Sequence, residues 1–220
     1  MSKTKFMAAG AGIVDADQTP LDGVVDHVEA FRYLGCHVTP DARSSFDVSR
    51  RVAAASGAFC TLRESVFASD DFSIAIKRIV YGVTVLAVLL YGSESWTVRQ
   101  RDVRRLESFH LQCVRSILKI NRGRQIEEHI SSLQVRRMWG DMEEIADKVR
   151  VRRLRWLGHV SRMPDRIPRQ LLYGALPSKR PPHGPRKRWK DSAKCDLMAV
   201  GVPLEQLGDI VQDRQGCVNT

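Results

Sequence analysis

The chain has 220 residues, 35 of them Lys or Arg and 25 Asp or Glu, which gives a formal net charge of +10. A hydrophobic content of 43% can form a packed core and excludes an intrinsically disordered chain. Five widely spaced cysteines argue against a disulfide framework, so we expect an intracellular protein, nuclear or cytoplasmic and not secreted. The longest apolar run, residues 79–91, is shorter than the ~20 residues that span a bilayer, which argues against a membrane partner.

Positive charge is concentrated in two parts of the chain. Residues 148–190 contain 14 basic residues and one acidic residue, and residues 48–124 carry a net charge of +7. Arginine outnumbers lysine by 26 to 9, and its planar guanidinium group matches phosphate geometry. This distribution predicts RNA or DNA as the partner, contacted through phosphates, and no small-molecule substrate.

Short strands are expected in the first 40 residues. An apolar run at 6–9 precedes an acidic, turn-rich stretch at 15–23, and apolar residues on both sides of Gly35 indicate a hairpin or a pair of strands. We interpret the acidic stretch as a solvated loop. The predicted fold class is mainly α with a small N-terminal β hairpin (α+β), in which a helical bundle is followed by a basic C-terminal region.

Three helices are predicted between residues 48 and 120. Apolar residues from 48 to 66 recur at alternating spacings of four and three, which defines one helix face. A second helix, at 72–91, is apolar on nearly all sides after Ile79, so we expect it to be the central element of the bundle and to end at Gly92. A third begins near Thr97, with an apolar stripe on one face and cations on the other.

The C-terminal half mixes cations with apolar residues. An acidic helical stretch leads into residues 148–160, where basic and apolar residues alternate. Six prolines then predict a linker at about 164–186, and a short final helix is expected at 191–200 before an acidic tail.

Six sequence blocks carry a resemblance to a known family. They are Ser2–Met7, Phe31–Gly35, Leu89–Trp96, Leu106–Cys113, Leu154–Met163 and Gly184–Asp191. In this order they resemble the C-terminal region of reverse transcriptases from non-LTR (LINE-type) retrotransposons, which are endonuclease/reverse transcriptase proteins. The first two blocks are similar to the motif D strand and to the primer-grip hairpin of motif E, and the others to the thumb and to later blocks.

The resemblance implies a division of the chain into four parts. Residues 1–41 would form the palm edge strands and a primer-grip-like hairpin, and residues 42–124 a thumb-like helical bundle. Residues 125–200 would form a basic helical C-terminal region that contains the proline-rich linker, and residues 201–220 an acidic tail. We therefore expect the C-terminal remnant of an RNA-directed DNA polymerase.

Catalysis is not expected from this chain alone. The family's catalytic aspartates precede motif D, in a Tyr-x-Asp-Asp turn, and this motif does not occur in the sequence. Because polymerisation requires carboxylates that hold two Mg²⁺ ions, we assign no catalytic residue, and the Mg²⁺ would belong to the complete enzyme. Lys3 and Thr4 occupy motif D-like positions, where the lysine of a complete enzyme would protonate the leaving pyrophosphate.

The primer-grip-like residues are Phe31, Tyr33, Leu34 and Gly35. The resemblance implies a tight backbone turn against a primer 3′ end, because glycine lets the backbone approach closely. The alternative is an ordinary hairpin whose tyrosine and leucine are buried. The sequence leaves both interpretations open.

Nucleic-acid-binding residues are expected in both basic regions, where cations neutralise phosphates and aromatic rings stack on unpaired bases. The alternative is a solvated basic face with Trp156 in the core. The predicted set is Arg50, Arg51, Arg101, Arg104, Arg105, Arg150, Arg152, Arg153, Arg155, Trp156, Arg186, Lys187, Arg188, Trp189 and Lys190.

A zinc site is a weaker hypothesis. His110 and Cys113 have the spacing of a zinc half-site, and His159 and Cys195 would complete a tetrahedral set. However, Cys113 lies on an apolar helix face, where a buried structural cysteine is the more common outcome. We therefore assign no metal or other cofactor to the chain.

Three hypotheses for function follow. The chain is a nucleic-acid-backbone-binding remnant of a retrotransposon polymerase, inactive alone, or a free-standing nucleic-acid-binding module derived from a mobile element. The third hypothesis is a truncated reading frame without function, whose unpaired strand edge would favour aggregation.

Overall fold

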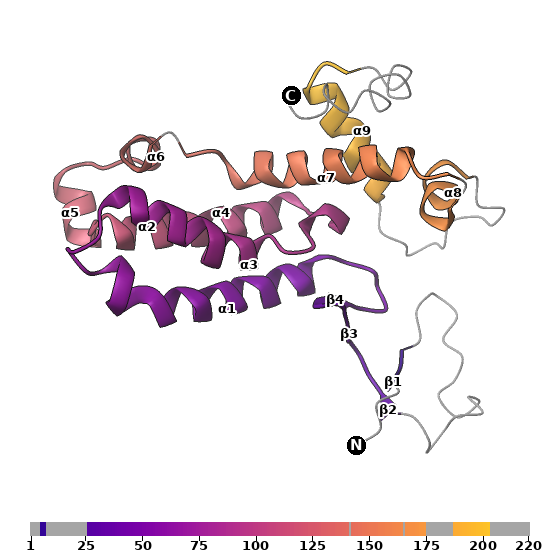
Figure 1. Ribbon diagram of the computed structural model, residues 1–220, viewed down its shortest axis with the longest axis horizontal. Helices are drawn as coiled ribbons and strands as arrows, with labels where there is room; N and C mark the ends of the chain where they lie inside the picture. The colour runs from indigo at the N-terminus through magenta and orange to yellow at the C-terminus, as the bar shows by residue number, and fades with distance from the viewer. Residues whose placement is uncertain (1–4, 8–25, 141, 165, 175–186, 203–220) are drawn as a thin grey trace. The chain divides into compact units, whose positions relative to one another are not determined.

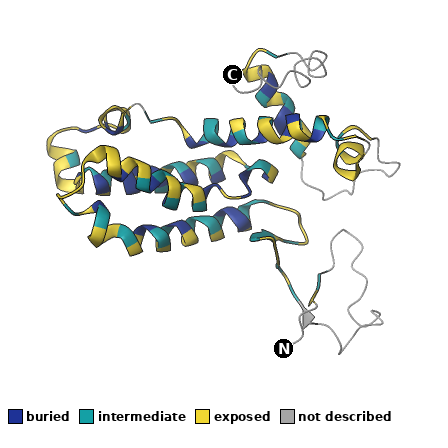
Figure 2. Ribbon diagram, viewed as in Figure 1, coloured by how far each residue is buried: buried dark blue, intermediate teal, exposed yellow. Residues whose placement is uncertain are grey.

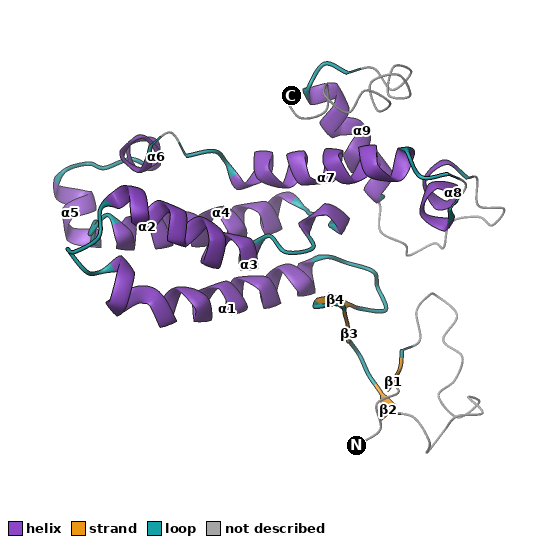
Figure 3. Cartoon of the chain, in the orientation of Figure 1, coloured by secondary structure: helices purple, strands orange, loops and turns teal. Residues whose placement is uncertain are grey.

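The computed structural model describes residues 5–7, 26–140, 142–164, 166–174 and 187–202 (Figure 1). Helices predominate among these residues, and the strands are short and confined to the N-terminal part (Figure 3). The predicted fold class, mainly α with a small N-terminal β hairpin, is therefore confirmed.

The chain divides into two compact units. Unit 1 combines residues 1–46, 92–97 and 150–220, and unit 2 combines residues 47–91 and 98–149. None of the helices described is long and apolar enough to cross a membrane.

Unit 2 is helical. Its elements are α1 (Ser45–Leu62), the π-helical segment η2 (Arg63–Phe67), α2 (Ile74–Tyr81), the π-helical segment η3 (Gly82–Leu86), α3 (Ala87–Leu89), α4 (Gln100–Ile117), α5 (Arg122–Glu127), α6 (Ser132–Trp139) and the first turn of α7 (Ile145–Ser161). The helices α1, α2 and α4 run alongside one another (Figure 1).

Aromatic rings form the centre of the unit 2 core. Phe59 of α1 stacks on Phe67 at 5.0 Å between ring centroids, and Phe67 meets Tyr81 of α2 edge-on at 6.2 Å. Tyr81 also contacts Trp139 of α6 edge-on at 5.7 Å. Because Phe59 and Val48 are both buried, the apolar face predicted over residues 48–66 is the face that α1 packs into the core.

The predicted single helix at 72–91 is wrong in two respects. Its π-helical part η3 interrupts the α-helix, where the Thr84 hydroxyl donates to the Val80 carbonyl at 2.6 Å, a contact that tends to bend helices. It is also not surrounded by other elements, because Ile79 and Val83 are 67% and 68% exposed (Figure 2). The core uses mainly the face of Tyr81, Val85 and Leu89, which recur every four residues, with Leu90 beside it. The helix ends at Leu89, before the predicted stop at Gly92, and Gly92 adopts a left-handed conformation with φ of 74°.

Unit 1 contains the strands and the C-terminal helices. Its elements are β1 (Lys5–Phe6), β2 (Asp26–His27), β3 (Phe31–Tyr33), β4 (Cys36–Val38), the 3₁₀ turn η4 (Ser93–Ser95), most of α7, α8 (Ile167–Tyr173) and α9 (Trp189–Ala199). β1 pairs with β2 in parallel, and β3 with β4 antiparallel.

A small apolar core joins α7 to α9. It consists of Leu157 of α7 with Ala193 and Leu197 of α9, all nearly inaccessible to solvent. Leu172 of α8 and Trp189 pack against this cluster. The core therefore fixes which face of α7 points away from the solvent within unit 1.

Candidate nucleic-acid interface

The hairpin expected around Gly35 is present, with an exposed tip. Phe31 lies opposite Val38 and Tyr33 opposite Cys36, so Leu34 and Gly35 form a two-residue turn. Both have positive φ, 47° and 84°, as a type I′ turn requires. Tyr33 is 62% and Leu34 76% exposed, so the alternative in which they are buried does not fit.

Gly92 allows the hairpin to contact the turn at residues 92–97. A Cβ atom at Gly92 would lie 2.3 Å from the Cys36 Sγ atom, so no larger residue fits here without a shift. Two of the blocks that carry the family resemblance, at 31–35 and 89–96, therefore lie next to each other. The motif D-like Lys3 and Thr4, like Arg186, lie outside the described residues.

In unit 2, predicted cations are exposed on α1 and α4, two helices that contact each other. The Arg105 guanidinium donates to the Ser49 hydroxyl at 2.7 Å, which brings the first half of α4 beside α1. Arg50, Arg101, Arg104 and Arg105 are exposed there. We name these four residues the α1–α4 basic surface.

Arg51 has a different setting from its neighbour Arg50. Its guanidinium lies 4.5 Å from the centre of the Tyr91 ring, and its Nε lies 3.9 Å from an Asp47 carboxylate oxygen. Only 12% of its side chain is exposed. These contacts stabilise the start of α1 and leave little of the guanidinium for a phosphate.

The arginines of α7 also separate into two groups. Arg153 is 4% exposed and forms an ion pair and hydrogen bond with Asp196 of α9. Arg150 lies 3.8 Å from the same carboxylate. Arg155 is exposed and Arg152 half-buried, so Arg150 and Arg153 hold two helices together while Arg155 reaches solvent.

Of the two predicted tryptophans of the basic C-terminal region, one supports the fold and the other is exposed to solvent. Trp189 packs on the α7–α9 core, and its indole N–H donates to the Glu94 carbonyl at 2.7 Å. Trp156 is 38% exposed, so the alternative that places it in the core does not fit. Lys187, Arg188 and Lys190, which surround Trp189 in sequence, are exposed at the start of α9.

Helix α8 lies within the segment predicted to be a linker. Pro168 occupies its first turn, a position where proline is tolerated, so prolines here start a helix instead of preventing one. The helix adds exposed Arg166 and Arg169, which the predicted set omits. The sequence signal for this helix is Pro168, because proline is favoured in the first turn of a helix.

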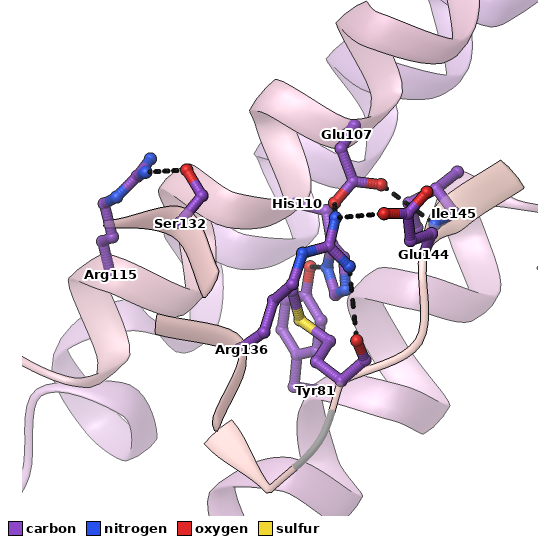
Figure 4. A network of polar contacts seen from close by, with 9 residues as sticks. Tyr81, Glu107, His110, Arg115, Ser132, Arg136, Glu144 and Ile145 are labelled. Carbon is purple, nitrogen blue, oxygen red and sulfur yellow. Dashed lines mark hydrogen bonds and ion pairs between the residues drawn. The ribbon is translucent and has the colours of Figure 1, made fainter. Parts of the chain in front are cut away.

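A network of polar contacts in unit 2 positions the start of α7 (Figure 4). The Glu107 carboxylate of α4 accepts hydrogen bonds from the Arg136 guanidinium of α6 at 2.5 Å and from the Ile145 backbone N–H at 2.9 Å. Arg136 also donates to the Met142 carbonyl at 3.2 Å. Glu107 thus satisfies one of the free N–H groups at the beginning of α7.

His110 and Cys113 of α4 lie in the core of unit 2. His110 is 1% exposed, and its Nδ1 atom shares a hydrogen bond with the Tyr81 hydroxyl at 2.7 Å. Burial lowers the pKa of His110 to about 4, and the positive charges of Lys148 and Arg136 act in the same direction. Burial raises the pKa of the Cys113 thiol to about 12, so this thiol is protonated at neutral pH. In the part of the chain that the structure describes, no three His, Cys, Asp or Glu residues are grouped to hold a metal ion.

Comparison with known proteins gives an informative similarity. The chain is 26% identical, over 196 residues, to an uncharacterised protein of Caenorhabditis elegans whose name describes it as transposon-derived. The aligned part covers 87% of this chain and 69% of that protein. The sequence matches no family model, and no solved structure matches it. The similarity indicates a transposon origin for the chain.

We predict that Asp196→Asn strongly destabilises the protein, because it leaves the buried Arg153 guanidinium without its counter-charge. The expected loss is about 3–5 kcal/mol in the free energy of unfolding, measured by urea denaturation. Arg155→Gln is the control, since an exposed cation of the same helix should change stability by less than about 0.5 kcal/mol. Equal effects of the two substitutions would contradict the assignment of Arg153 as a structural residue.

We also predict an acid-sensitive contribution from His110. Its folded-state pKa of about 4 lies below the ordinary value of 6.5, so the unfolded chain binds a proton more readily between these values. The free energy of unfolding should therefore fall as the pH drops from 6.5 to 4. Above pH 6.5 the histidine is neutral in both states and adds no pH dependence.

The matched variant is His110→Asn, whose amide can replace the Nδ1 contact with Tyr81 but does not titrate. Unfolding free energies of both proteins should be measured across this pH range. The difference in slope between them isolates the histidine, and identical slopes would refute the prediction.

Proposed function

We propose that this chain binds RNA or DNA through backbone phosphates, and that it derives from the C-terminal region of a non-LTR retrotransposon reverse transcriptase. The observation that carries the proposal is the α1–α4 basic surface: Arg105 of α4 contacts Ser49 of α1, and Arg50, Arg101 and Arg104 are exposed on the same two helices. The transposon origin and the ordered sequence blocks support the family assignment.

The C-terminal helices supply further candidate phosphate ligands. Lys187, Arg188 and Lys190 lie at the N-terminal end of α9, where the helix dipole disfavours cations but favours a bound anion. Arg155, Arg166 and Arg169 are exposed on α7 and α8. By contrast, Arg51, Arg150, Arg153 and Trp189 support the fold and contribute to binding indirectly.

The hairpin tip fits a role beside a primer. Tyr33 and Leu34 are large apolar side chains at the end of a tight turn, and both are exposed to solvent. These two adjacent side chains are therefore accessible for contact with another molecule. In a complete polymerase we expect this turn to contact the 3′ end of the primer strand.

A free-standing nucleic-acid-binding module remains the second candidate. The stacked aromatic core of unit 2 and the ion pair between α7 and α9 in unit 1 favour a stably folded product over a reading frame without function. The two candidates share the same surface chemistry and differ only in whether a polymerase palm acts with it.

Nucleic-acid affinity should fall steeply with salt, because bound cations release counterions from the phosphates. We predict that Arg50→Gln with Arg104→Gln lowers the slope of log Kd against log salt concentration by about 2, or about 1 for each cation. Fluorescence anisotropy with a labelled oligonucleotide measures this slope. Arg63→Gln is the control, since Arg63 is an exposed cation of unit 2 outside this surface.

The chain alone should not synthesise DNA. It contains no Tyr-x-Asp-Asp motif, so the two Mg²⁺ ions of polymerisation have no known carboxylate ligands in this sequence. We expect no primer extension with an RNA or DNA template in the presence of Mg²⁺. Metal-dependent extension by the purified chain would overturn this part of the proposal.

A further inference from the structure

We infer that α7 carries a stacking site for an unpaired base at Trp156, which makes this part of the chain selective for single-stranded nucleic acid. The inference rests on the proposed function and adds the class of substrate. It starts from the two faces of α7 within unit 1. Arg153, Leu157 and Val160 are buried on one face, whereas Arg155, Trp156 and His159 are exposed on the other.

Trp156 is exceptional among the four tryptophans of the chain. Trp96 and Trp139 are 2% and 7% exposed, and the indole of Trp189 is held by Glu94 and the α7–α9 core. Trp156 is 38% exposed and belongs to a helix that has an apolar core available on its other side. Its ring therefore remains partly accessible at the surface, where a ligand can reach it.

The surroundings of Trp156 specify the chemistry of that molecule. The His159 ring lies one turn along the helix, with 5.4 Å between ring centroids and an interplanar angle of 39°, so it supports the indole from one side. Arg155 precedes Trp156 directly, and Arg152 lies one turn earlier, so cations accompany the ring along α7. An aromatic ring among cations suits a base attached to a phosphate backbone.

A single strand satisfies this arrangement better than a duplex does. In a duplex the faces of each base are already stacked on neighbouring bases, whereas an unpaired base has a face free for the indole. Stacking on an aromatic side chain is tolerant of sequence, because every base has a π-face. The site should therefore distinguish single strands from duplexes and not one base from another.

The test compares two probes with the full-length chain, a labelled single strand of about 15 nucleotides and the corresponding duplex. Trp156→Ala should weaken single-strand binding about 10-fold and duplex binding less than about 2-fold, with the salt slope unchanged. Trp156→Phe, which keeps a ring, should retain most of the single-strand affinity. Equal affinity of wild type and Trp156→Ala for the single strand would overturn the inference.

Two further measurements separate the possible failures. Single-strand binding should quench the tryptophan fluorescence of the unmodified chain, and Trp156→Phe should lose most of that quenching; absence of quenching in the wild type would also overturn the inference. If the wild type binds neither probe at low salt, the proposed function itself fails. If it binds both probes and Trp156→Ala weakens both equally, only the stacking site is refuted.

Discussion

Asp196 of α9 receives the guanidinium groups of Arg150 and Arg153, which α7 presents one turn apart. Placing a guanidinium at 4% exposure is costly unless a carboxylate compensates it. The pair therefore ties α7 to α9 in one rotational setting, with Leu157 on the same inner side. This setting determines which side chains of α7 face the solvent in unit 1, among them Arg155 and Trp156.

In unit 2, a carboxylate on α4 also holds neighbouring helices together. Glu107 joins the Arg136 guanidinium of α6 to the first backbone N–H group of α7, that of Ile145, so a single side chain connects three helices. The Tyr81–His110 hydrogen bond lies in the same core, where burial keeps the histidine neutral. Satisfied polar contacts of this kind specify one packing arrangement where apolar contacts alone would allow several.

The sequence predicts correctly those elements that depend on local signals. The hairpin at Gly35 and the apolar face of α1 were predicted because turn chemistry and a regular stripe are local signals. The helix after Ile74 is not central to the bundle as expected, because an apolar sequence does not reveal which face of a helix lacks a partner. The prolines around α8 were read as a linker, although proline is compatible with the first turn of a helix.

The candidate site shows a deeper limit of sequence reasoning. Cations occur on both the buried and the exposed face of α7, so composition cannot tell Arg153, which is buried against Asp196, from Arg155, which reaches solvent. Composition likewise cannot tell the exposed Trp156 from Trp189, which packs on the α7–α9 core. Only the long-range partners, Asp196 and the Glu94 carbonyl, distinguish the structural member of each pair.

This separation changes what the net charge of +10 means. Part of the arginine content stabilises helix packing and is unavailable to a ligand, so phosphate binding depends on fewer cations than the sequence contains. Backbone attraction of that kind is indifferent to sequence and to strand number, and it weakens with salt. Discrimination between nucleic acids has to come from groups that act on bases, and on α7 the group placed for this is the exposed indole of Trp156, supported by His159. Affinity and selectivity would then reside in different side chains, with different responses to ionic strength.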